Sequence, residues 1–398
     1  MSIVVQKYGG SSVAGVGKLR QVAERIMRTK RAGHDLVVVV SAMGDTTDDL
    51  LAMAKQVSPS PDRRELDMLL TAGERISMAL LSMAIRELGG DAISFTGSQS
   101  GIITNDRHVD ARIVEVRPFR VQDELARGKI VVIAGFQGVS YRREVTTLGR
   151  GGSDTTAVAM AAALNADYCE ICSDVDGVYS ADPKVVTDAR RIGTLSYEET
   201  QELAESGARV LNAQAVEFAK EKGIAIYARA TSSALPGADP SADGTVVRRH
   251  PPRMPGTVVG VASERDVLVV EADADSNDLL AALDEHHVAG KQLHISTSAR
   301  HATLVVSREN LHDEARVRAA LAARFAERVR VIDGLGAVSA IGAGINATYA
   351  NVRAGIAALR DAGIEPRGLS TSSFRATWMV PSDNVAAAVR ALHSRFIE

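Results

Sequence analysis

The chain has 398 residues, of which 45% are hydrophobic and 24% charged, as is typical of a soluble globular enzyme with two or three domains. The net charge is −3 and no dense run of Lys or Arg occurs, which argues against a nucleic acid or an anionic membrane as partner. Residues 1–7 lack the pattern of a signal peptide and no apolar stretch reaches about eighteen residues, so we expect a cytoplasmic protein.

The first expected strand, residues 3–6, leads into a loop that is similar to a phosphate-binding loop. A nucleotide P-loop needs Gly, four residues and then Gly-Lys-Ser/Thr, but here Gly15 is followed by Val16, which excludes that motif. A lysine at the strand end, Lys7, followed by two glycines, two serines and an expected helix, can still hold an anion.

Short runs rich in Val and Ile alternate with segments of helical spacing over the first 230 residues. We expect strands at residues 3–6, 35–41, 92–95, 129–136, 168–174 and 224–230. This alternation predicts an α/β fold with a mainly parallel sheet covered by helices on both faces. The helix expected at residues 66–88 contains several methionines, which we interpret as packing residues.

Polar residues follow the second expected strand and interrupt the methionine-rich helix. Ser41 and Thr47 come after the strand at residues 35–41, and Glu74 lies next to Arg75 in the helix. A buried carboxylate needs a cationic or hydrogen-bonding partner. An ammonium group of a ligand or a structural ion pair with Arg75 or another base would satisfy Glu74 equally well.

The second glycine-rich loop, residues 147–154, precedes the strongly helix-forming segment 155–166. Its glycines permit a close backbone approach, while Ser153 and Asp154 stand where a helix would be capped. Arg150 within this turn makes a positive site suited to a carboxylate or a phosphate. The alternative is that Asp154 only caps the helix and that the glycines only form a turn. The glycines are Gly149, Gly151 and Gly152.

The loop that follows the strand at residues 168–174 carries Asp174, Asp176 and Asp182. It resembles a calcium loop only superficially, because no glutamate closes it at the twelfth position. Its place at the carboxyl end of a strand favours the nucleotide side of a site. The chain's two cysteines, Cys169 and Cys172, lie in the strand itself, and we expect buried free thiols and not a redox pair.

A proline-rich segment, residues 234–256, marks the expected domain boundary. Beyond it, residues 266–307 and 337–381 both show the order strand, helix, strand, strand, and a helix at 384–396 follows. A repeated unit of this size buries its own sheet face poorly, so we expect two copies packed together.

Seven motifs together resemble those of the aspartate kinases, members of the amino acid kinase family that usually carry two C-terminal ACT domains. The motifs are QKYGGSSV, VVVVSAMGDTTDDLL, DMLLTAGERIS, SFTGSQSGI, VIAGFQGV, TTLGRGGSDTTAVA and EICSDVDGVYSADPK. The resemblance covers residues 1 to about 230 closely and the rest loosely. It implies a three-layer kinase domain at 1–250, a linker and first ACT strand at 251–264, and βαββαβ ACT domains at 265–335 and 336–398.

The resemblance implies ATP-dependent phosphorylation of the side-chain carboxylate of L-aspartate, the first step toward lysine, threonine and methionine. It also implies ATP and Mg²⁺ as cofactors, with the metal held mainly by the ATP phosphates, and a homodimer or dimer of dimers formed through the ACT domains. Two alternatives remain: a related kinase acting on glutamate, N-acetylglutamate or carbamate, and a non-catalytic, amino-acid-sensing ACT subunit.

The same resemblance implies roles for individual residues. Lys7 and Asp154 would be catalytic, with Lys7 bridging the transferring phosphoryl group and Asp154 organising Lys7. The substrate would contact Ser41, Thr47, Glu74, Arg150, Gly151, Gly152 and Ser153. The nucleotide would contact Lys7, Tyr8, Gly9, Gly10, Ser11, Ser173, Asp174, Tyr179, Asp182, Lys184 and Arg209. Arg209 stands where the family commonly has a lysine, so a planar guanidinium replaces a point charge at the phosphates.

The regulatory half departs furthest from the family. Feedback-inhibited relatives typically have an Asp-x-Pro-Gly turn before the first ACT helix, whereas residues 273–277 read DADSN. We therefore expect the ACT pair to serve mainly as a dimerisation scaffold, with weakened feedback by lysine and threonine. The alternative is an effector site rebuilt from Asn277, Gln292 and His294. In the second ACT unit, Ser370 and Thr371 are retained.

Overall fold

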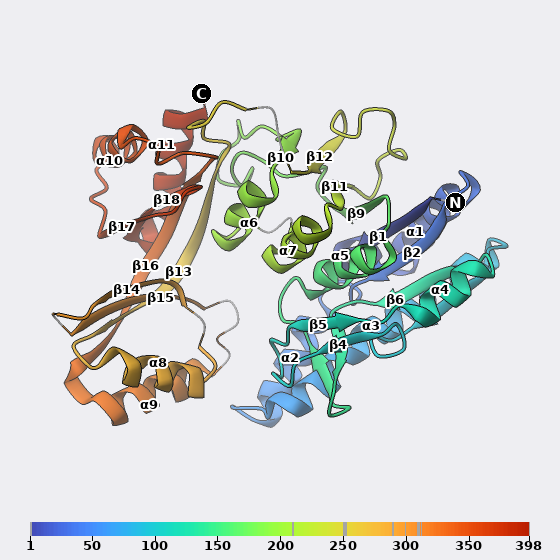
Figure 1. Cartoon of the computed structure of the whole chain (residues 1–398), viewed down its shortest axis with the longest axis horizontal. Helices are drawn as coiled ribbons and strands as arrows, with labels where there is room; N and C mark the ends of the chain where they lie inside the picture. The colour runs from blue at the N-terminus through green and yellow to red at the C-terminus, as the bar shows by residue number, and fades with distance from the viewer. Residues whose placement is uncertain are drawn as a thin grey trace. The chain divides into compact units, whose positions relative to one another are not determined.

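The computed structural model describes residues 2–208, 211–249, 253–288, 290–298, 300–308, 311 and 313–397. The chain forms two compact units (Figure 1). The first contains Met1–Val178, Arg191–Gln201 and Arg209–Pro252, and the second contains Tyr179–Arg190, Glu202–Ala208 and Arg253–Glu398. Two short segments that precede residue 209 therefore belong to the C-terminal unit.

The first unit is built on an eight-stranded sheet with the order β10-β12-β11-β9-β1-β2-β6-β3. All neighbouring strands are parallel except β11 and β12, so the expected mainly parallel sheet is confirmed. The strands are β1 (Ile3–Tyr8), β2 (Asp35–Val40), β3 (Ala92–Phe95), β6 (Ile130–Ala134), β9 (Tyr168–Ser173), β10 (Thr194–Leu195), β11 (Ala225–Ala230) and β12 (Gly244–Val247).

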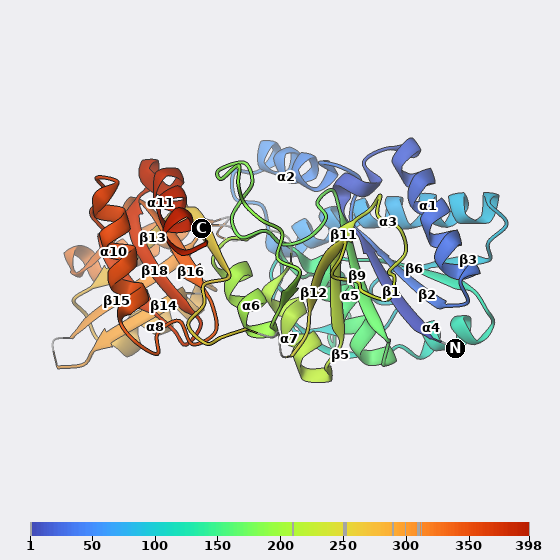
Figure 2. The same cartoon turned by 90° about the horizontal axis from the view of Figure 1, so that it is seen from above.

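Helices cover both faces of this sheet (Figure 2). Alternate residues of β1 face opposite ways, so that Tyr8 packs under α1 and α3 while Lys7 points toward α5. Helix α5 also packs against α7. The helices of this unit are α1 (Val16–Arg31), α2 (Thr46–Val57), α3 (Arg63–Glu87), α4 (Phe119–Ala126), α5 (Gly152–Leu164) and α7 (Ala213–Lys222), and α6 (Tyr197–Glu205) is divided between the two units.

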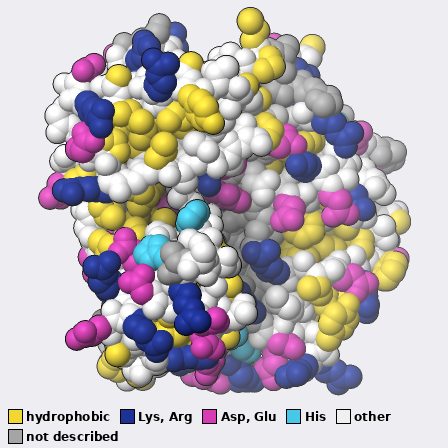
Figure 3. Space-filling model, turned by 60° about the vertical axis from the view of Figure 1, so that its left-hand side comes forward, with side chains coloured by type: hydrophobic (Ala, Val, Ile, Leu, Met, Phe, Trp, Pro, Cys, Tyr) yellow, Lys and Arg dark blue, Asp and Glu magenta, His cyan; other side chains and the backbone are white. Residues whose placement is uncertain are grey.

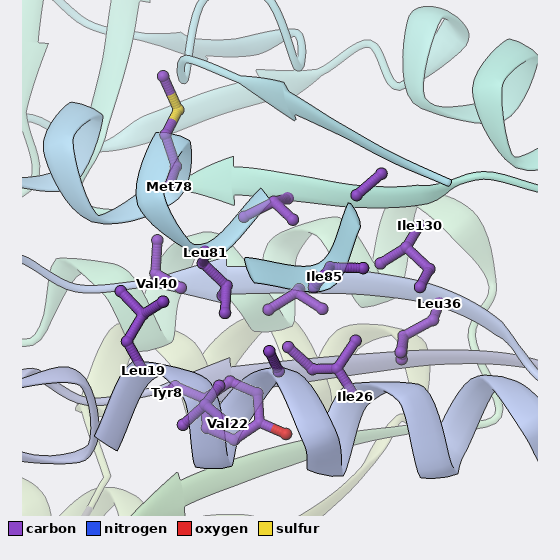
Figure 4. Packing of buried hydrophobic residues seen from close by; sticks show 14 of the residues in the cluster. Tyr8, Leu19, Val22, Ile26, Leu36, Val40, Met78, Leu81, Ile85 and Ile130 are labelled. Atoms are coloured by element: carbon purple, nitrogen blue, oxygen red, sulfur yellow. The ribbon is translucent and has the colours of Figure 1, made fainter. Parts of the chain in front are cut away.

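The core between the sheet, α1 and α3 is an apolar cluster that includes the Tyr8 ring (Figure 4), while the Tyr8 hydroxyl donates to the buried Gln6 Oε1 over 3.1 Å. Leu81 and Ile85 of α3 are fully buried there, and Met78 joins them as predicted. Met68 and Met83, in contrast, are exposed, so the prediction that the methionines of this helix pack is wrong for these two. Met68 and Met83 lie on the outer face of α3. The spacing of apolar residues in the sequence did not distinguish this face from the buried one.

Helix α3 is also long and apolar enough to cross a membrane by length and composition. Half of its most apolar window is buried inside the protein, as in the core helix of a globular domain. The two cysteines on β9 are free and fully buried, as expected, and burial raises the pKa of both thiols.

A small second sheet with the order β5-β4-β7-β8 lies in the same unit. Its hairpin of β7 and β8 follows β6 directly and leads into the second glycine-rich loop, so it determines where that loop begins. The strands are β4 (Ile102–Thr104), β5 (Ile113–Val116), β7 (Gln137–Ser140) and β8 (Val145–Thr147).

The second unit contains one antiparallel six-stranded sheet with the order β14-β15-β13-β16-β18-β17. Its strands are β13 (Gly260–Ala272), β14 (Gly290–Ser296), β15 (His301–Ser307), β16 (Val329–Ile341), β17 (Gly368–Thr371) and β18 (Arg375–Pro381). Its helices are α8 (Ser276–Glu285), α9 (Glu314–Phe325), α10 (Ala350–Asp361) and α11 (Val385–Ile397). The predicted repeat is therefore present, in the form of ACT-like halves.

The two halves are joined more closely than the sequence suggested. Strands β13 and β16 each span 13 residues, pair along most of their length and run through both halves. Helices α8 and α9 bury one apolar cluster against them, and α10 and α11 bury another that includes Trp378. On the described surface drawn in Figure 3, Lys and Arg side chains are interspersed with Asp and Glu.

Candidate active site

The loop after β1 is shaped by close packing against the loop after β2. A Cβ atom on Gly10 would lie 2.9 Å from the Ala42 carbonyl oxygen and 3.0 Å from that of Gly44, so only glycine fits there. The Gly9 amide donates to the Cys172 carbonyl over 3.2 Å, which commits this N–H to the fold. The Ser12 and Thr231 hydroxyl groups share a hydrogen bond of 2.7 Å.

The helix expected directly after Ser12 begins later than predicted. Residues Gly10–Val13 form a short 3₁₀ turn, and α1 begins only at Val16 with Gly15 at its N-cap. The loop therefore presents a tight turn, and not the first turn of α1, at the carboxyl edge of the sheet. Lys18, the lysine of the rejected P-loop, donates to the Ser11 carbonyl over 2.9 Å.

Lys7 and Asp154 form an ion pair at the same edge. Lys7 Nζ lies 2.6 Å from Asp154 Oδ1, and the side chains are only 12% and 9% exposed. The Lys7 Nζ and Asp154 Oδ1 atoms are close enough for an ion pair, but their orientation is not that of a hydrogen bond. Lys7 Nζ also lies 3.7 Å from the Cβ position of Gly9, so the ammonium group sits over the glycine loop.

Asp154 is not the cap of α5, which removes its simplest structural explanation. The N-cap is Gly151 with φ of 73°, and no side chain bonds there. Asp154 lies in the first helical turn, where the helix dipole favours a negative charge. The expectation that Asp154 stands at the cap position is wrong: it lies three residues after the N-cap, and its side chain points to Lys7.

The turn that holds Arg150 is fixed by left-handed glycines and by one asparagine. Gly149 and Gly151 have φ of 72° and 73°, values that favour glycine. Asn212 caps α7, donates to the Arg150 carbonyl over 2.9 Å and accepts from Thr155 over 3.1 Å. Arg150 itself is exposed, while Gly152 and Ser153 are buried.

Glu74 is a buried carboxylate with one oxygen unused by the described protein. The side chain is 3% exposed, and Oε1 accepts from the Ala42 amide over 3.1 Å. Oε2 has no hydrogen-bond partner among the described residues, and burial raises the pKa of this carboxyl to about 7. No ion pair joins Glu74 to the exposed Arg75 in the described chain, which disfavours the structural alternative.

Ser41 and Thr47 follow β2 at the same sheet edge. The Ser41 amide donates to the Tyr8 carbonyl over 3.1 Å, and the Ser41 carbonyl accepts from the Ser77 hydroxyl over 2.7 Å. Thr47 lies in the first turn of α2 and is partly exposed. The structure therefore brings Lys7, Glu74, Asp154 and the loop after β2 to one edge of the first unit.

The nucleotide-side residues divide between the two units. Ser173 ends β9 and bonds locally to Val175, and Asp174 is exposed beside it, both in the first unit. Tyr179, Asp182 and Lys184 belong to the second unit, where Asp182 accepts from the Lys184 amide over 2.9 Å. Arg209 lies outside the described residues.

The candidate regulatory residues lie in the second unit. Asn277 and His294 are exposed and Gln292 is half-buried, while Ser370 and Thr371 lie on β17. Asp275 caps α8 by accepting from the amides of Asn277 and Asp278. The preceding Asp273 carboxylate contacts His301 Nδ1 over 2.7 Å.

Two residues near the site were missed by sequence reasoning. Phe136 has φ of 68°, unusual for a bulky side chain, and its ring lies 3.1 Å from the Cβ position of Gly152. Asn212 lies 62 positions after Arg150. An asparagine at a helix start predicts a cap, but nothing local to it predicts a bond to the arginine loop.

Among the described residues, no group of three or more His, Cys, Asp or Glu side chains could hold a metal ion by itself. A Mg²⁺ ion usually takes one or two carboxylates together with substrate phosphates, and exposed Asp174 at the strand end fits that requirement. The calcium interpretation of the loop at 172–184, already disfavoured by its sequence, gains no support from this geometry.

Known proteins show the same organisation. The model of the amino acid kinase family matches residues 2–228. Aspartokinase from Mycolicibacterium smegmatis is 45% identical over 100% of this chain and 96% of its own length. The chain belongs to the aspartokinases of the amino acid kinase family. Aspartokinase from Corynebacterium glutamicum is 44% identical over the same shares of both chains.

Solved structures extend the likeness to the fold of the whole chain. E. coli aspartokinase III in complex with aspartate and ADP superposes with a TM-score of 0.85 at 24% identity, and the match covers 100% of both chains. At this identity the likeness shows the fold, which includes both the kinase sheet and the ACT pair. The family resemblance and the α/β fold predicted from the motifs are thus confirmed.

Proposed function

We propose that the protein transfers the γ-phosphoryl group of ATP to the side-chain carboxylate of L-aspartate, releasing ADP and 4-phospho-L-aspartate. Full-length similarity to aspartokinases supports this reaction. The structural observation that carries it is the Lys7–Asp154 ion pair at the same sheet edge as Glu74, whose buried Oε2 has no partner in the described chain. The Lys7 ammonium and the buried Glu74 carboxylate are thus placed to bind a substrate that carries both negative and positive groups.

Phosphoryl transfer requires the positioning of two anions more than covalent chemistry by the enzyme. A carboxylate oxygen of aspartate attacks the γ-phosphorus, and the bond to the bridging β–γ oxygen breaks with its electron pair leaving on ADP. Lys7 stabilises the charge on the transferring group, and Asp154 holds the Lys7 ammonium in place through their 2.6 Å contact. Because the substrate supplies the nucleophile, no covalent enzyme intermediate is needed.

Aspartate is recognised at its two backbone charges in this proposal. The exposed Arg150 guanidinium clamps the α-carboxylate, because its planar fork matches a carboxylate, with Gly151, Gly152 and Ser153 shaping the turn. Glu74 Oε2 accepts from the α-ammonium, and Ser41 and Thr47 line the pocket. An ammonium group beside Glu74 favours the ionised carboxylate, which burial alone disfavours.

The nucleotide is held by the strand-end loops. Gly10 and Ser11 donate to phosphates, and Ser173 and Asp174 at the end of β9 supply further nucleotide contacts from the first unit. Asp174 would help to hold a Mg²⁺ ion together with the ATP phosphates, and the ion would supply charge neutralisation there. Departures from the family at Arg209 affect ATP affinity more than turnover, since charge is kept and geometry changes.

A hydroxylamine trap tests this function directly. The purified protein with ATP and Mg²⁺ is expected to form a hydroxamate from aspartate, and little from glutamate or N-acetylglutamate. If a hydroxamate forms from one of the other acids but not from aspartate, that acid and not aspartate is the substrate. The absence of any acid-dependent ADP release would instead favour the non-catalytic sensing subunit.

We also propose a cytoplasmic homodimer or dimer of dimers assembled through the ACT pair. Relatives that share the whole chain support the presence of that pair, and closed symmetric dimers are the commonest assembly of such proteins. Light scattering is expected to give at least twice the chain mass of 42.1 kDa. A single species at the monomer mass would contradict this assembly.

A further inference from the structure

Asp67 is a fully buried carboxylate of the first unit to which the proposed function gives no role. Asp67 of α3 is 0% exposed and accepts three hydrogen bonds. Its Oδ1 accepts from the Thr147 hydroxyl over 2.5 Å and from the Val109 amide over 3.0 Å. Its Oδ2 lies 2.6 Å from His108 Nδ1. A charge taken out of water is stable only with such partners, so Asp67 fixes their positions as much as they fix its own.

These partners come from two segments that meet beside the arginine loop. Thr147 ends β8, three residues before Arg150, and His108 and Val109 belong to the connection between β4 and β5. The Ala111 amide donates to the Thr147 carbonyl over 2.8 Å, which ties the two segments together. Asp67 therefore joins α3, the 105–112 connection and β8 at one point.

The 105–112 connection packs closely against the turn that precedes Arg150. The Cβ position of Gly149 lies 3.0 Å from Asp110 Oδ1 and 3.3 Å from the Val109 carbonyl oxygen. Gly149 is left-handed, with φ of 72°, and its turn packs against this connection with no room for a side chain. A displacement of Val109 would thus be passed to the arginine one residue beyond Gly149.

Val109 is held in a conformation that its side chain disfavours. Its φ is 72°, in the left-handed region that β-branched residues rarely adopt. Such a backbone persists only where surrounding contacts determine it, and here its amide is bonded to Asp67. Helix α3 also carries Glu74, seven residues and about two turns from Asp67.

We propose that Asp67 is a positioning residue that sets the Arg150 turn relative to Glu74, so that the two ends of the amino-acid substrate are met at a fixed separation. The inference rests on the proposed function and deepens it. Loss of an Asp67 bond would loosen the substrate clamp and leave the nucleotide side unchanged. The distinguishing sign is a higher KM for aspartate at nearly constant KM for ATP.

Two neighbouring threonines offer a matched test. Thr147 and Thr146 are both 0% exposed on β8, but the Thr146 hydroxyl bonds to Thr104 over 2.6 Å and not to Asp67. Thr147→Val and Thr146→Val each remove one buried hydroxyl bond without changing shape. We expect Thr147→Val to raise the KM for aspartate about five- to twentyfold, since small displacements of a substrate clamp are costly, with the KM for ATP within about twofold. Thr146→Val should leave both values near wild type.

His108→Phe gives a second, independent break of the same cluster. It removes the contact to Asp67 Oδ2 at a side chain that is 20% exposed, where a ring of similar size is tolerated. It is expected to raise the KM for aspartate in the same direction, and thermal melting of all three variants checks folding.

The possible failures are distinguishable. Equal aspartate KM values in the two threonine variants, with an active wild type, would overturn the positioning role alone. A wild-type protein that neither phosphorylates nor binds aspartate would overturn the proposed function, and the positioning role with it. A parallel rise of both KM values in Thr147→Val would show a general loss of structure and would also overturn the inference.

Discussion

The charged residues at the centre of the candidate active site differ in burial from most candidate regulatory residues of the second unit. In the first unit, Lys7, Asp154 and Glu74 are largely withdrawn from water and meet specific atoms. In the second, Asn277 and His294 are exposed, and Asp273 is paired with His301 at the surface. Buried charges tolerate few changes of partner, whereas exposed ones are replaced at little cost. The comparison predicts large effects of substitutions in the first unit and small effects in the second.

The largest effect is expected from Lys7→Ala. Removing the ammonium group takes away the cation that stabilises the transferring phosphoryl group, and it leaves Asp154 buried without its partner. Turnover should fall by at least about a hundredfold, with a smaller change in the KM for aspartate. Steady-state kinetics with ATP and aspartate measure both.

Lys18→Ala is the matched control for this prediction. Lys18 lies near the same loop but reaches only the Ser11 carbonyl from the solvent side. Turnover within about threefold of wild type is expected, because a surface contact of this kind contributes little. Similar losses in both variants would show that the loop, and not the Lys7 charge, controls the reaction.

Glu74→Gln is expected to have the next largest effect. The amide keeps the size of the side chain but cannot offer a charge to the substrate ammonium, so the KM for aspartate should rise about ten- to a hundredfold. Glu87→Gln, at the exposed end of the same helix, is the control and should leave the KM unchanged. An unchanged KM in Glu74→Gln would remove Glu74 from the substrate site.

The raised pKa of Glu74 also predicts how stability depends on pH. Burial raises the pKa from 4.5 to about 7 in the folded protein, so the folded state holds a proton that the unfolded state has released. Its stabilising contribution is complete below the unfolded pKa and is lost as the pH rises toward 7. From pH 5.5 to 7 the free energy of unfolding should fall by about 1 to 2 kcal/mol more in wild type than in Glu74→Gln.

Denaturant titrations of the two proteins without substrate measure this difference. Added aspartate should reduce it, because a bound ammonium group favours the ionised carboxylate. Parallel pH profiles for wild type and Glu74→Gln would contradict the raised pKa.

The sequence was sufficient for features that depend on local patterns. Runs of Val and Ile predicted β1, β2 and β6, and the sequence placed Lys7 and Ser41 at the ends of the first two strands, which the structure pairs side by side. It was insufficient where partners lie far apart along the chain. Asp67 and Thr147 are 80 positions apart, and neither lies in a pattern that predicts the other.

Strand length in the second unit was missed for a related reason. The sequence analysis placed a first ACT strand within residues 251–264 and another strand from residue 266. The structure has one strand, β13, from Gly260 to Ala272, whose first residues pair with the end of β16, about 80 positions later. Because both halves share the two long strands, they form one continuous sheet. A repeat in the sequence predicts two units but not this sharing of strands. Pairing over such distances depends on tertiary contacts that local propensity does not encode.

The smallest effect is expected from lysine and threonine, alone or together. In the turn before α8, Asp275 is used as the helix cap and Asp273 contacts His301, while the proline and glycine typical of feedback-inhibited relatives are absent. Each lost charged or amide contact weakens binding of an amino-acid zwitterion by roughly ten- to a hundredfold. Millimolar lysine plus threonine should therefore leave the rate nearly unchanged in steady-state assays. Strong joint inhibition that disappears in an Asn277→Ala, Gln292→Ala, His294→Ala triple variant would instead establish a rebuilt effector site and a regulatory role for the ACT pair.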